Sequence, residues 1–223
     1  MTSARAVVFD FDGVLADTEG LHLRAFQDVF AVRGWTLERA EYFDRYLGFD
    51  DRELVRAFAA DSSRSLSSAD EDIIVADKAR LYEQRAAAGS ILFPGAARTI
   101  ARLGAAFRLA IASGSLRGEI AAVLAANDLT RAIAAVIGAD DVARSKQAPD
   151  AYAAAVAALG VAPSDAVAIE DSRWGLVSAR AAGLRTIGIT TSYPAGALDL
   201  ADVIVHDLDE VTTDLVDSLL GGG

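Results

Sequence analysis

The stretch Val7-Val8-Phe9-Asp10-Phe11-Asp12-Gly13-Val14-Leu15 determines how the rest of this 223-residue chain is interpreted. Its apolar, β-branched first half is typical of a strand buried on both faces of a parallel sheet. Asp10 and Asp12 alternate with an apolar residue, so an extended chain would point both carboxylates to the same side. Gly13 then lets the backbone turn sharply out of the sheet. Ligands of open α/β sheets bind at the carboxyl ends of strands, so the pair predicts a nucleophile beside an acid/base, or a metal site.

The composition limits the kinds of protein that this chain can be. With 52% hydrophobic residues it can bury one sizeable core and a small second lobe. A net charge of −11 argues against binding to nucleic acid or to an anionic membrane surface. There are no cysteines, which excludes disulfides and thiolate chemistry. The first residues lead straight into the first strand, and no apolar run approaches the roughly 18 residues of a membrane span, so we expect a cytoplasmic protein without a membrane partner.

Residues 16–89 have a helical pattern throughout. Apolar residues recur at helical spacing over 18–34, 37–46, 51–60 and 69–88, and none of the intervening segments has the alternation of a strand. We therefore predict a lobe of helices inserted between the first and second strands.

From residue 90 onward, strands and helices alternate to the end of the chain. This alternation is typical of a parallel sheet with crossover helices on both faces. We thus predict an α/β fold with a Rossmann-like core formed by residues 1–15 and 90–223, and a helical-bundle domain formed by residues 16–89. The strands after the first are expected at 108–112, 134–137, 166–169, 185–189 and 203–205.

Three later segments place polar residues where the first strand has its two acids. Ser113, followed by Gly114 and Ser115, ends the second strand, where a hydroxyl and backbone N–H groups can hold a phosphate oxygen. Ser113 can equally be a simple helix N-cap. Lys146 precedes a helix and can neutralise a phosphate. Glu170 and Asp171 close another apolar strand, which is costly unless the acids are solvated, paired or bound to a cation.

In this order and at these positions, the segments resemble the four motifs of the haloacid dehalogenase-like superfamily, in its β-phosphoglucomutase and sugar-phosphatase branch. The first motif is Asp-Phe-Asp-Gly-Val-Leu-x-Asp-Thr-Glu, and the last is followed by a Ser172-x-x-Gly-x-x-x-Ala-x-x-Ala-Gly run. The resemblance covers nearly the whole chain, and the helical insertion matches that branch's cap domain. Ser145 and Gln147 depart from the family's glycine and proline around the lysine, which puts the geometry of this loop in question.

The resemblance implies a role for each residue. Asp10 would be the nucleophile that forms an aspartyl-phosphate, and Asp12 the general acid/base. Ser113 and Lys146 would hold the phosphoryl oxygens. Mg²⁺ would be bound by Asp10, the Asp12 carbonyl and Asp171, supported by Glu170. The candidates for contact with the substrate on the cap side, each equally able to be a solvated or capping residue, are Thr18, Glu19, His22, Arg52 and Lys78. Gly114, Ser115 and Arg117 are further candidates for contact with the substrate.

The acceptor of the phosphoryl group distinguishes the remaining alternatives. A phosphomutase would use the same residues but transfer the group to a sugar hydroxyl, while a receiver-like signalling module would lack the insertion and the Asp-x-Asp pair. The mutases carry a lysine after the second-motif serine that grips the far phosphate, and here Leu116 stands there, although Arg117 or Arg52 can substitute. His22 and Lys78 do match the mutases. We predict a monomeric, Mg²⁺-dependent phosphatase acting on a small phosphorylated metabolite, a sugar phosphate.

Overall fold

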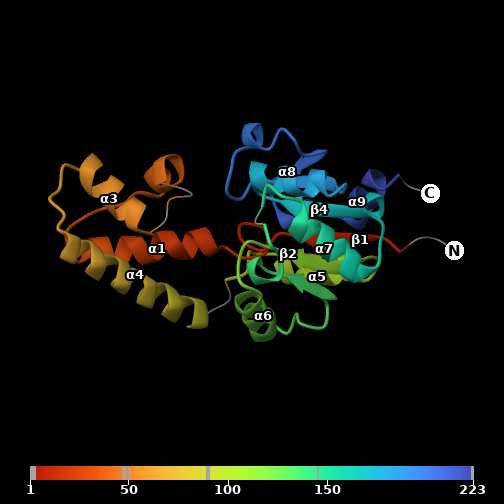
Figure 1. Ribbon diagram of the computed structural model, residues 1–223, viewed down its shortest axis with the longest axis horizontal. Helices are drawn as coiled ribbons and strands as arrows, with labels where there is room; N and C mark the ends of the chain where they lie inside the picture. Colours follow the sequence, from red (N-terminus) through yellow and green to blue (C-terminus); the bar gives the residue numbers. More distant parts are fainter. Residues whose placement is uncertain (1–3, 47–48, 50, 89–90, 145, 222–223) are drawn as a thin grey trace. The chain divides into compact units, whose positions relative to one another are not determined.

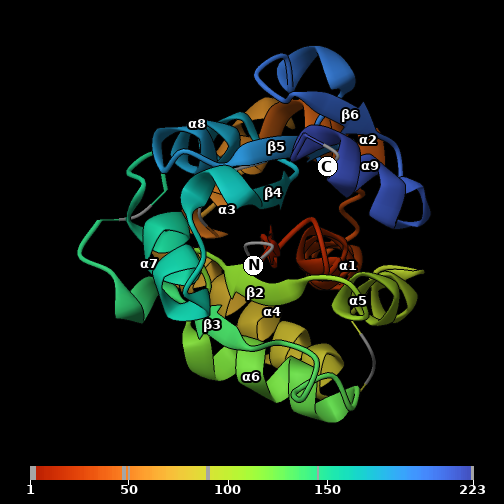
Figure 2. The ribbon, with the colours of Figure 1, turned by 90° about the vertical axis from the view of Figure 1, so that its right-hand side faces the viewer.

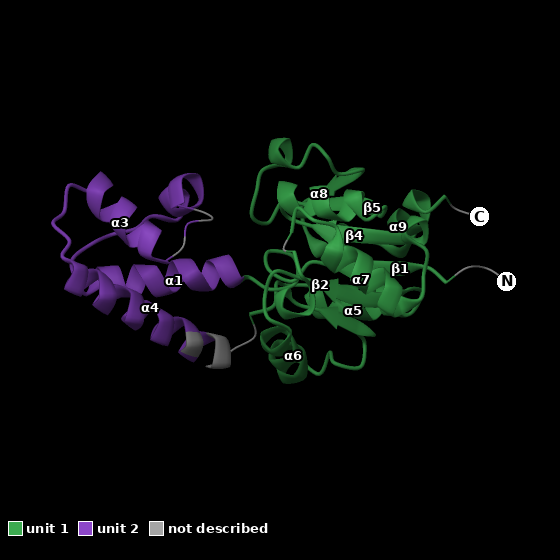
Figure 3. Cartoon of the chain, viewed as in Figure 1, with its two compact units in different colours: residues 1–17, 90–223 green, residues 18–89 purple. Residues whose placement is uncertain are grey.

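The structure, a computed structural model, describes residues 4–46, 49, 51–88, 91–144 and 146–221. It divides into two compact units, residues 1–17 with 90–223 and residues 18–89 (Figure 3). The first boundary follows Asp17 and not Leu15, because the chain after Leu15 still pairs with the larger unit. Ala16 bridges to Leu92, and the Asp17 N–H donates to the Ile91 carbonyl at 2.7 Å.

The larger unit contains one parallel sheet of six strands in the order β3-β2-β1-β4-β5-β6 (Figure 1). The predicted α/β fold is therefore confirmed. The third strand begins one residue later, and the fourth ends one residue later, than the sequence predicts. The strands are β1 (Ala6–Phe9), β2 (Arg108–Ala112), β3 (Ala135–Ile137), β4 (Ala166–Glu170), β5 (Arg185–Ile189) and β6 (Val203–Val205).

Strand β1 lies inside the sheet, between β2 and β4. Val7 pairs with Leu109 on one side and with Val167 on the other. All four residues of β1 are fully buried, as the apolar run predicts for a strand that is covered on both faces.

Helices cover both faces of this sheet (Figure 2). Helices α7 and α8 lie on one face and α5 and α9 on the other. Residues on alternate positions of β1, β2 and β4, all alanines except Val8, form one buried cluster with Tyr152, Val156 and Leu159 of α7. The helices of this unit are α5 (Ala96–Gly104), α6 (Arg117–Ala126), α7 (Asp150–Leu159), α8 (Arg173–Ala181) and α9 (Thr213–Leu219), with short 3₁₀ turns η2 (Ala139–Asp141), η3 (Pro163–Asp165), η4 (Ala195–Ala197) and η5 (Leu208–Glu210).

The smaller unit is helical, as predicted. Its elements are α1 (Thr18–Ala31), α2 (Arg39–Glu41), the π-helical turn η1 (Tyr42–Tyr46), α3 (Asp51–Asp61) and α4 (Ser68–Ala88). They surround an apolar core that includes Phe26, Phe30, Leu54, Phe58 and Ile74.

One predicted helix of this unit is wrong in detail. The sequence predicts a single helix over 37–46, whereas α2 begins at Arg39 and passes into a π-helical turn at Tyr42. Leu37 stays outside the helix, and its carbonyl accepts a hydrogen bond from Gln27 Nε2 at 2.9 Å. Among all the described helices, none is long and apolar enough to cross a membrane.

Candidate active site

Asp10 directly follows β1, at the place where the order of the strands reverses. Chain order runs outward from β1 to β2 and β3 on one side and continues with β4 on the other. Ligand sites of open α/β sheets lie outside the carboxyl ends of the strands at such a reversal. The Asp10 N–H donates to the Ile169 carbonyl of β4 at 2.9 Å, which extends the pairing of the two strands to the residue that bears the carboxylate.

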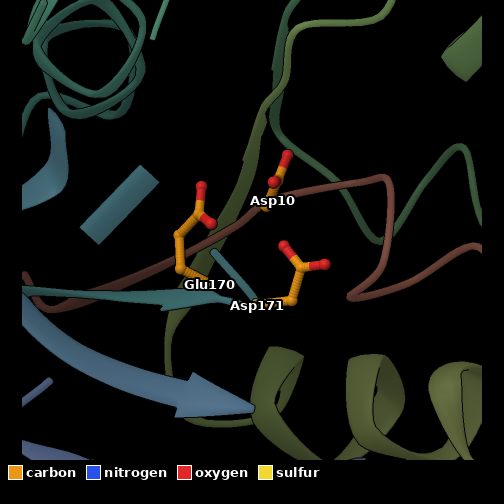
Figure 4. Close-up of side chains that lie close together, drawn as sticks. All are labelled: Asp10, Glu170 and Asp171. Carbon is orange, nitrogen blue, oxygen red and sulfur yellow. The ribbon is translucent and has the colours of Figure 1, made fainter. Parts of the chain in front are cut away.

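Three acids from β1 and β4 converge at this point. Asp10, Glu170 and Asp171 each offer a carboxylate oxygen, and these oxygens lie within 4.8 Å of one another (Figure 4). All three side chains are buried, and Glu170 has no exposed surface. Buried carboxylates at this spacing repel one another unless cations or protons compensate them, so the cluster is a candidate for binding a cation.

Lys146 is the positively charged group of this cluster. Its ammonium lies 2.5 Å from Asp10 Oδ1 and 2.7 Å from Glu170 Oε1, and its side chain is 15% exposed. The loop before α7 therefore brings the lysine to the strand ends, as expected. One ammonium leaves two of the three carboxylates without a compensating charge.

The pKa values reflect this shortage of positive charge. Burial, followed by repulsion from Glu170, raises the pKa of Asp10 well above its usual value, although Lys146 opposes the shift. Burial and then Glu170 likewise raise the pKa of Asp171 to about 7. Burial alone would raise the pKa of Glu170 too, but Lys146 and the hydrogen bonds of Tyr152 and Asp10 together lower that pKa. Keeping all three groups ionised thus requires a further positive charge.

Asp12 is held by two hydroxyl groups. Ser115 Oγ donates to Asp12 Oδ2 at 2.6 Å, and Ser113 Oγ donates to the same oxygen at 3.1 Å. The Ser115 N–H in turn donates to Ser113 Oγ at 3.0 Å. The end of β2 therefore positions the second acid of the Asp-x-Asp pair, and Ser113 lies beside it.

Two glycines allow the acids to approach the backbone closely. Gly13 has a φ of +75°, and a Cβ atom there would lie 1.8 Å from Asp171 Oδ2. At Gly175 a Cβ atom would lie 1.7 Å from Glu170 Oε1. Both distances are impossible contacts, so each glycine is required for a carboxylate to occupy its position.

Sequence reasoning missed several residues that support the cluster. Tyr152 is fully buried, and its hydroxyl donates to Glu170 Oε1 at 2.8 Å. Ser192 hydrogen-bonds Asp171, and Thr191 Oγ1 donates to the Gly13 carbonyl. The tyrosine is the only aromatic residue of the alanine-rich helix α7, but the sequence does not distinguish it from an ordinary core aromatic. Ser192 follows β5 in a loop without any such signal. Ser172 also donates to Glu170, from both its N–H and its hydroxyl.

The loop around Lys146 reaches the site in an unusual conformation. Gln147 has a backbone φ of +97°. Residues other than glycine rarely adopt this angle, and proline cannot adopt it. The backbone at residue 147 therefore differs from the one that a proline after the lysine would impose. The Lys146 ammonium nevertheless contacts Asp10. Ser145, the other departure, lies outside the described residues.

The expected substrate contacts fall into two groups, one in each unit. In the larger unit, Gly114 and Ser115 follow β2, and Arg117 begins α6 and pairs with Asp141 at 3.4 Å. In the smaller unit, Thr18 is buried at the start of α1. Glu19, His22 and Arg52 line one cavity, and Lys78 is hydrogen-bonded to His22 Nδ1 at 2.6 Å.

Known proteins resemble this chain over nearly its whole length. Residues 7–189 match the family model described as haloacid dehalogenase-like hydrolase. Protein CbbY of Rhodobacter capsulatus is 37% identical over 96% of this chain and 98% of its own length. The β-phosphoglucomutase of Bacillus subtilis is 26% identical over 95% of this chain and 93% of its own length. A crystal structure of Rhodobacter sphaeroides CbbY, a mutant bound to xylulose 1,5-bisphosphate, is 31% identical, has a TM-score of 0.69, and covers 93% of this chain and 96% of that one.

The chain belongs to the haloacid dehalogenase-like hydrolase family. Its relatives place it in the branch that contains CbbY proteins and β-phosphoglucomutases, as the four motifs suggested. It is a phosphohydrolase-type enzyme, and the receiver-like alternative is excluded.

Proposed function

We propose that this chain is a Mg²⁺-dependent phosphatase that hydrolyses a small phosphorylated metabolite, a sugar phosphate, through an aspartyl-phosphate at Asp10. The observation that carries the proposal is the convergence of Asp10, Glu170 and Asp171 with Lys146 at the reversal of strand order. CbbY relatives, one of them crystallised with a sugar bisphosphate, support a sugar phosphate as the substrate.

The donor set of the cluster fits magnesium. Three carboxylates and one ammonium leave two uncompensated negative charges, which a divalent cation would balance. The ligands are all oxygen, and Mg²⁺ prefers such ligands. Asp10, Asp171 and the Asp12 carbonyl would hold the ion, and Glu170 would support them. The bound ion would neutralise the charge of the phosphoryl group in a protein that is itself strongly anionic.

In the proposed reaction, Asp10 attacks the phosphorus in line, and the bond to the leaving oxygen breaks. Covalent catalysis of this kind divides one difficult step into two. Asp12 protonates the leaving oxygen and then accepts a proton from the water that attacks the aspartyl-phosphate, so that the bond to the Asp10 oxygen breaks and inorganic phosphate leaves. The hydroxyls of Ser113 and Ser115 keep the Asp12 carboxylate in place for both proton transfers. Lys146 stabilises the negative charge on the transferred group.

A sugar phosphomutase is the second candidate. The hydrogen-bonded pair of His22 and Lys78 favours it, because these residues match the mutases. The deciding assay supplies β-glucose 1-phosphate with a trace of the 1,6-bisphosphate. Formation of glucose 6-phosphate much faster than inorganic phosphate would replace the hydrolase with the mutase.

The first prediction concerns the nucleophile. Asp10→Asn should lower the turnover of p-nitrophenyl phosphate by more than about 10³-fold, because the amide is a poor nucleophile of nearly the same shape. Circular dichroism should show the same fold. Glu38→Gln, an equal change of charge on an exposed residue, is the control. Wild-type activity in purified Asp10→Asn would refute the mechanism.

The second prediction concerns the metal. Excess EDTA should abolish turnover, and added Mg²⁺ should restore it. Mg²⁺ should also raise the midpoint of thermal unfolding, because an ion that binds only the folded state stabilises it by about 2.7 kcal/mol at a hundred times its Kd. Asp171→Asn should reduce this shift. Unchanged hydrolysis in EDTA, with no change of the midpoint, would contradict a metal-dependent site.

A further inference from the structure

We propose that Asp140 is a positioning residue for the general acid/base, because it anchors the loop after β2 whose serines hold Asp12. This inference rests on the proposed function, since it concerns the role proposed there for Asp12. Asp140 lies outside the four motifs, in the short turn η2 that follows β3. A chain of hydrogen bonds within the larger unit connects it to the acid.

Two serine hydroxyls fix one oxygen of the Asp12 carboxylate. Ser113 Oγ and Ser115 Oγ both donate to Asp12 Oδ2, at 3.1 and 2.6 Å. Ser113 Oγ also accepts from the Ser115 N–H, so its single proton is left for Asp12. With Oδ2 held in this way, Oδ1 is the oxygen that can pass a proton to the leaving group. The position of the acid therefore depends on the position of residues 113–115.

The chain after β3 holds this loop by its backbone. The Ser113 N–H donates to the Ile137 carbonyl at 3.0 Å, and the Ala139 N–H donates to the Ser115 carbonyl at 2.9 Å. These two bonds continue the pairing of β2 with β3 past the ends of the two strands. The loop that holds Asp12 is thus fixed to residues 137–139.

Asp140 secures the far end of the loop, at the start of α6. Its Oδ1 accepts from the Arg117 N–H at 2.9 Å. The first N–H groups of a helix have no partners within it, and the side chain of Leu116, the N-cap residue, accepts from none of them. The hydrogen bond from Arg117 is the main cause that lowers the pKa of Asp140, which keeps this acceptor ionised at neutral pH. Asp140 thus takes the place of a capping side chain that the loop itself does not supply.

Gly138 allows the two segments to approach each other this closely. A Cβ atom there would lie 2.4 Å from the Arg117 nitrogen and 2.7 Å from Asp140 Oδ1, the two atoms that form the hydrogen bond. Its φ of −97° is open to any residue, so glycine is required here for space alone. Asp141 Oδ2 accepts from the Gly138 N–H at 3.0 Å and fixes the turn. Three residues of the turn after β3 therefore support one contact with α6.

Two aryl phosphates of nearly the same shape separate the positioning of an acid from a general loosening of the site. Phenolate is a poorer leaving group than p-nitrophenolate, so phenyl phosphate gains more from protonation by Asp12. The value of kcat/KM reports the transfer of the phosphoryl group to Asp10, since that step releases the leaving group. Misplacing Asp12 should therefore lower kcat/KM for phenyl phosphate most, whereas a loosened phosphate site should lower kcat/KM for both substrates equally.

We expect Asp140→Ala, in the full chain with Mg²⁺, to lower kcat/KM about tenfold for phenyl phosphate and at most about twofold for p-nitrophenyl phosphate. Asp140→Asn keeps a side-chain oxygen that can accept from the Arg117 N–H, and it should restore the ratio of the two values to within about twofold of the wild type. Gly138→Ala disturbs the same contact without removing a carboxylate and should reproduce the effect of Asp140→Ala.

The matched control is Asp207→Ala. This exposed aspartate accepts backbone N–H groups at the start of η5, so the same substitution removes the same charge and a similar cap there. It should leave the ratio of the two substrates unchanged. Equal losses with both substrates in Asp140→Ala, or wild-type values with both, would overturn the inference; if that variant does not fold, the same outcomes in Gly138→Ala decide.

Asp12→Asn separates this inference from the proposed function. It should itself lose more activity with phenyl phosphate than with p-nitrophenyl phosphate. Equal losses in Asp12→Asn would refute the acid role in the proposed function. A selective loss in Asp12→Asn that is missing in Asp140→Ala would refute the role of Asp140 alone.

Discussion

Gln147 occupies a backbone conformation that its side chain disfavours. Its φ of +97° lies in the region that glycine adopts without penalty and that costs other residues about 1–2 kcal/mol. The cost is borne directly beside Lys146, whose ammonium contacts Asp10 and Glu170. The conformation thus belongs to the loop that delivers the positive charge of the site.

Replacing Gln147 by proline tests whether this conformation is required. Proline fixes φ near −65°, so the loop would have to change its course and Lys146 would lose its position. We expect Gln147→Pro to lower kcat at least tenfold. Gln147→Gly, which accepts the observed φ, should retain activity. Equal activity of both variants would show that the lysine does not depend on this loop conformation.

At the scale of a residue, the sequence indicates the acids and hydroxyls of the site far better than the residues that hydrogen-bond to them. Asp10, Lys146 and Glu170 were predicted from strand ends and motifs, and the structure brings them together. Tyr152 was not, because a single tyrosine in a helix looks like any core aromatic until its hydroxyl is seen to face Glu170. Likewise, Ser192 approaches Asp171 only through folding.

At the scale of the elements, one carboxylate joins the last two strands of the sheet. Asp202 Oδ2 accepts hydrogen bonds from the Thr186 N–H at 2.7 Å and the Thr186 hydroxyl at 3.0 Å, and Arg180 lies 3.2 Å from its other oxygen. Burial alone would raise the pKa of Asp202, but the hydrogen bonds from Thr186 and the charge and hydrogen bond of Arg180 together lower the pKa. The ionised form therefore stabilises the connection between β5 and β6.

Replacing this carboxylate should give a stability loss that depends on pH. We expect Asp202→Asn to lower the free energy of unfolding by about 1 kcal/mol at pH 7, since the amide keeps the geometry but not the charge. A depressed pKa stabilises the folded state above the unfolded pKa, near 3.8, and this contribution is lost as the pH falls through the folded pKa. The difference should therefore be constant from pH 7 to 5 and shrink below about pH 4.

Urea unfolding of both proteins at pH 7, 5, 4 and 3.5 measures this difference. Asp165→Asn, which changes a partly buried acid at the end of another connection, serves as the control. A difference in the free energy of unfolding that grows as the pH falls would contradict a stabilising role of the ionised Asp202.

Among the elements, the spacing of apolar residues failed to predict the structure of one segment. Strands and long helices were predicted to within a few residues, because their apolar spacing follows from burial on one or both faces. The segment 37–46 was not, since Tyr42 and Tyr46 have a spacing that suits an α-helix. Their hydroxyls bind Glu19 and Asp61, residues distant in sequence, and the chain forms a π-helical turn there.

At the scale of the whole molecule, the order of the motifs predicted the fold, because crossover connections in a parallel sheet leave few arrangements. The two compact units and their boundary near residue 17 follow from the long helical insertion. The motifs do not indicate the identity of the substrate. The ion pairs of Arg52 and Lys78, for example, form between helices and have no signature along the chain.

The scarcity of lysine has a practical consequence. Among 21 basic residues only Lys78 and Lys146 are lysines, and each ammonium is bound to carboxylates. Burial alone would lower the pKa of Lys146, but Asp10 and Glu170 outweigh it and raise it, which keeps this amine protonated and poorly nucleophilic. Acylation with an N-hydroxysuccinimide ester at neutral pH should therefore stop at the single α-amine, and intact-mass analysis should show one added label. Two further labels should appear only in denaturant. Rapid triple labelling of the native protein would mean that the two lysine amines leave their carboxylate partners and open to solvent. A single label would make the chain suitable for attachment of a dye or a surface linker at its α-amine.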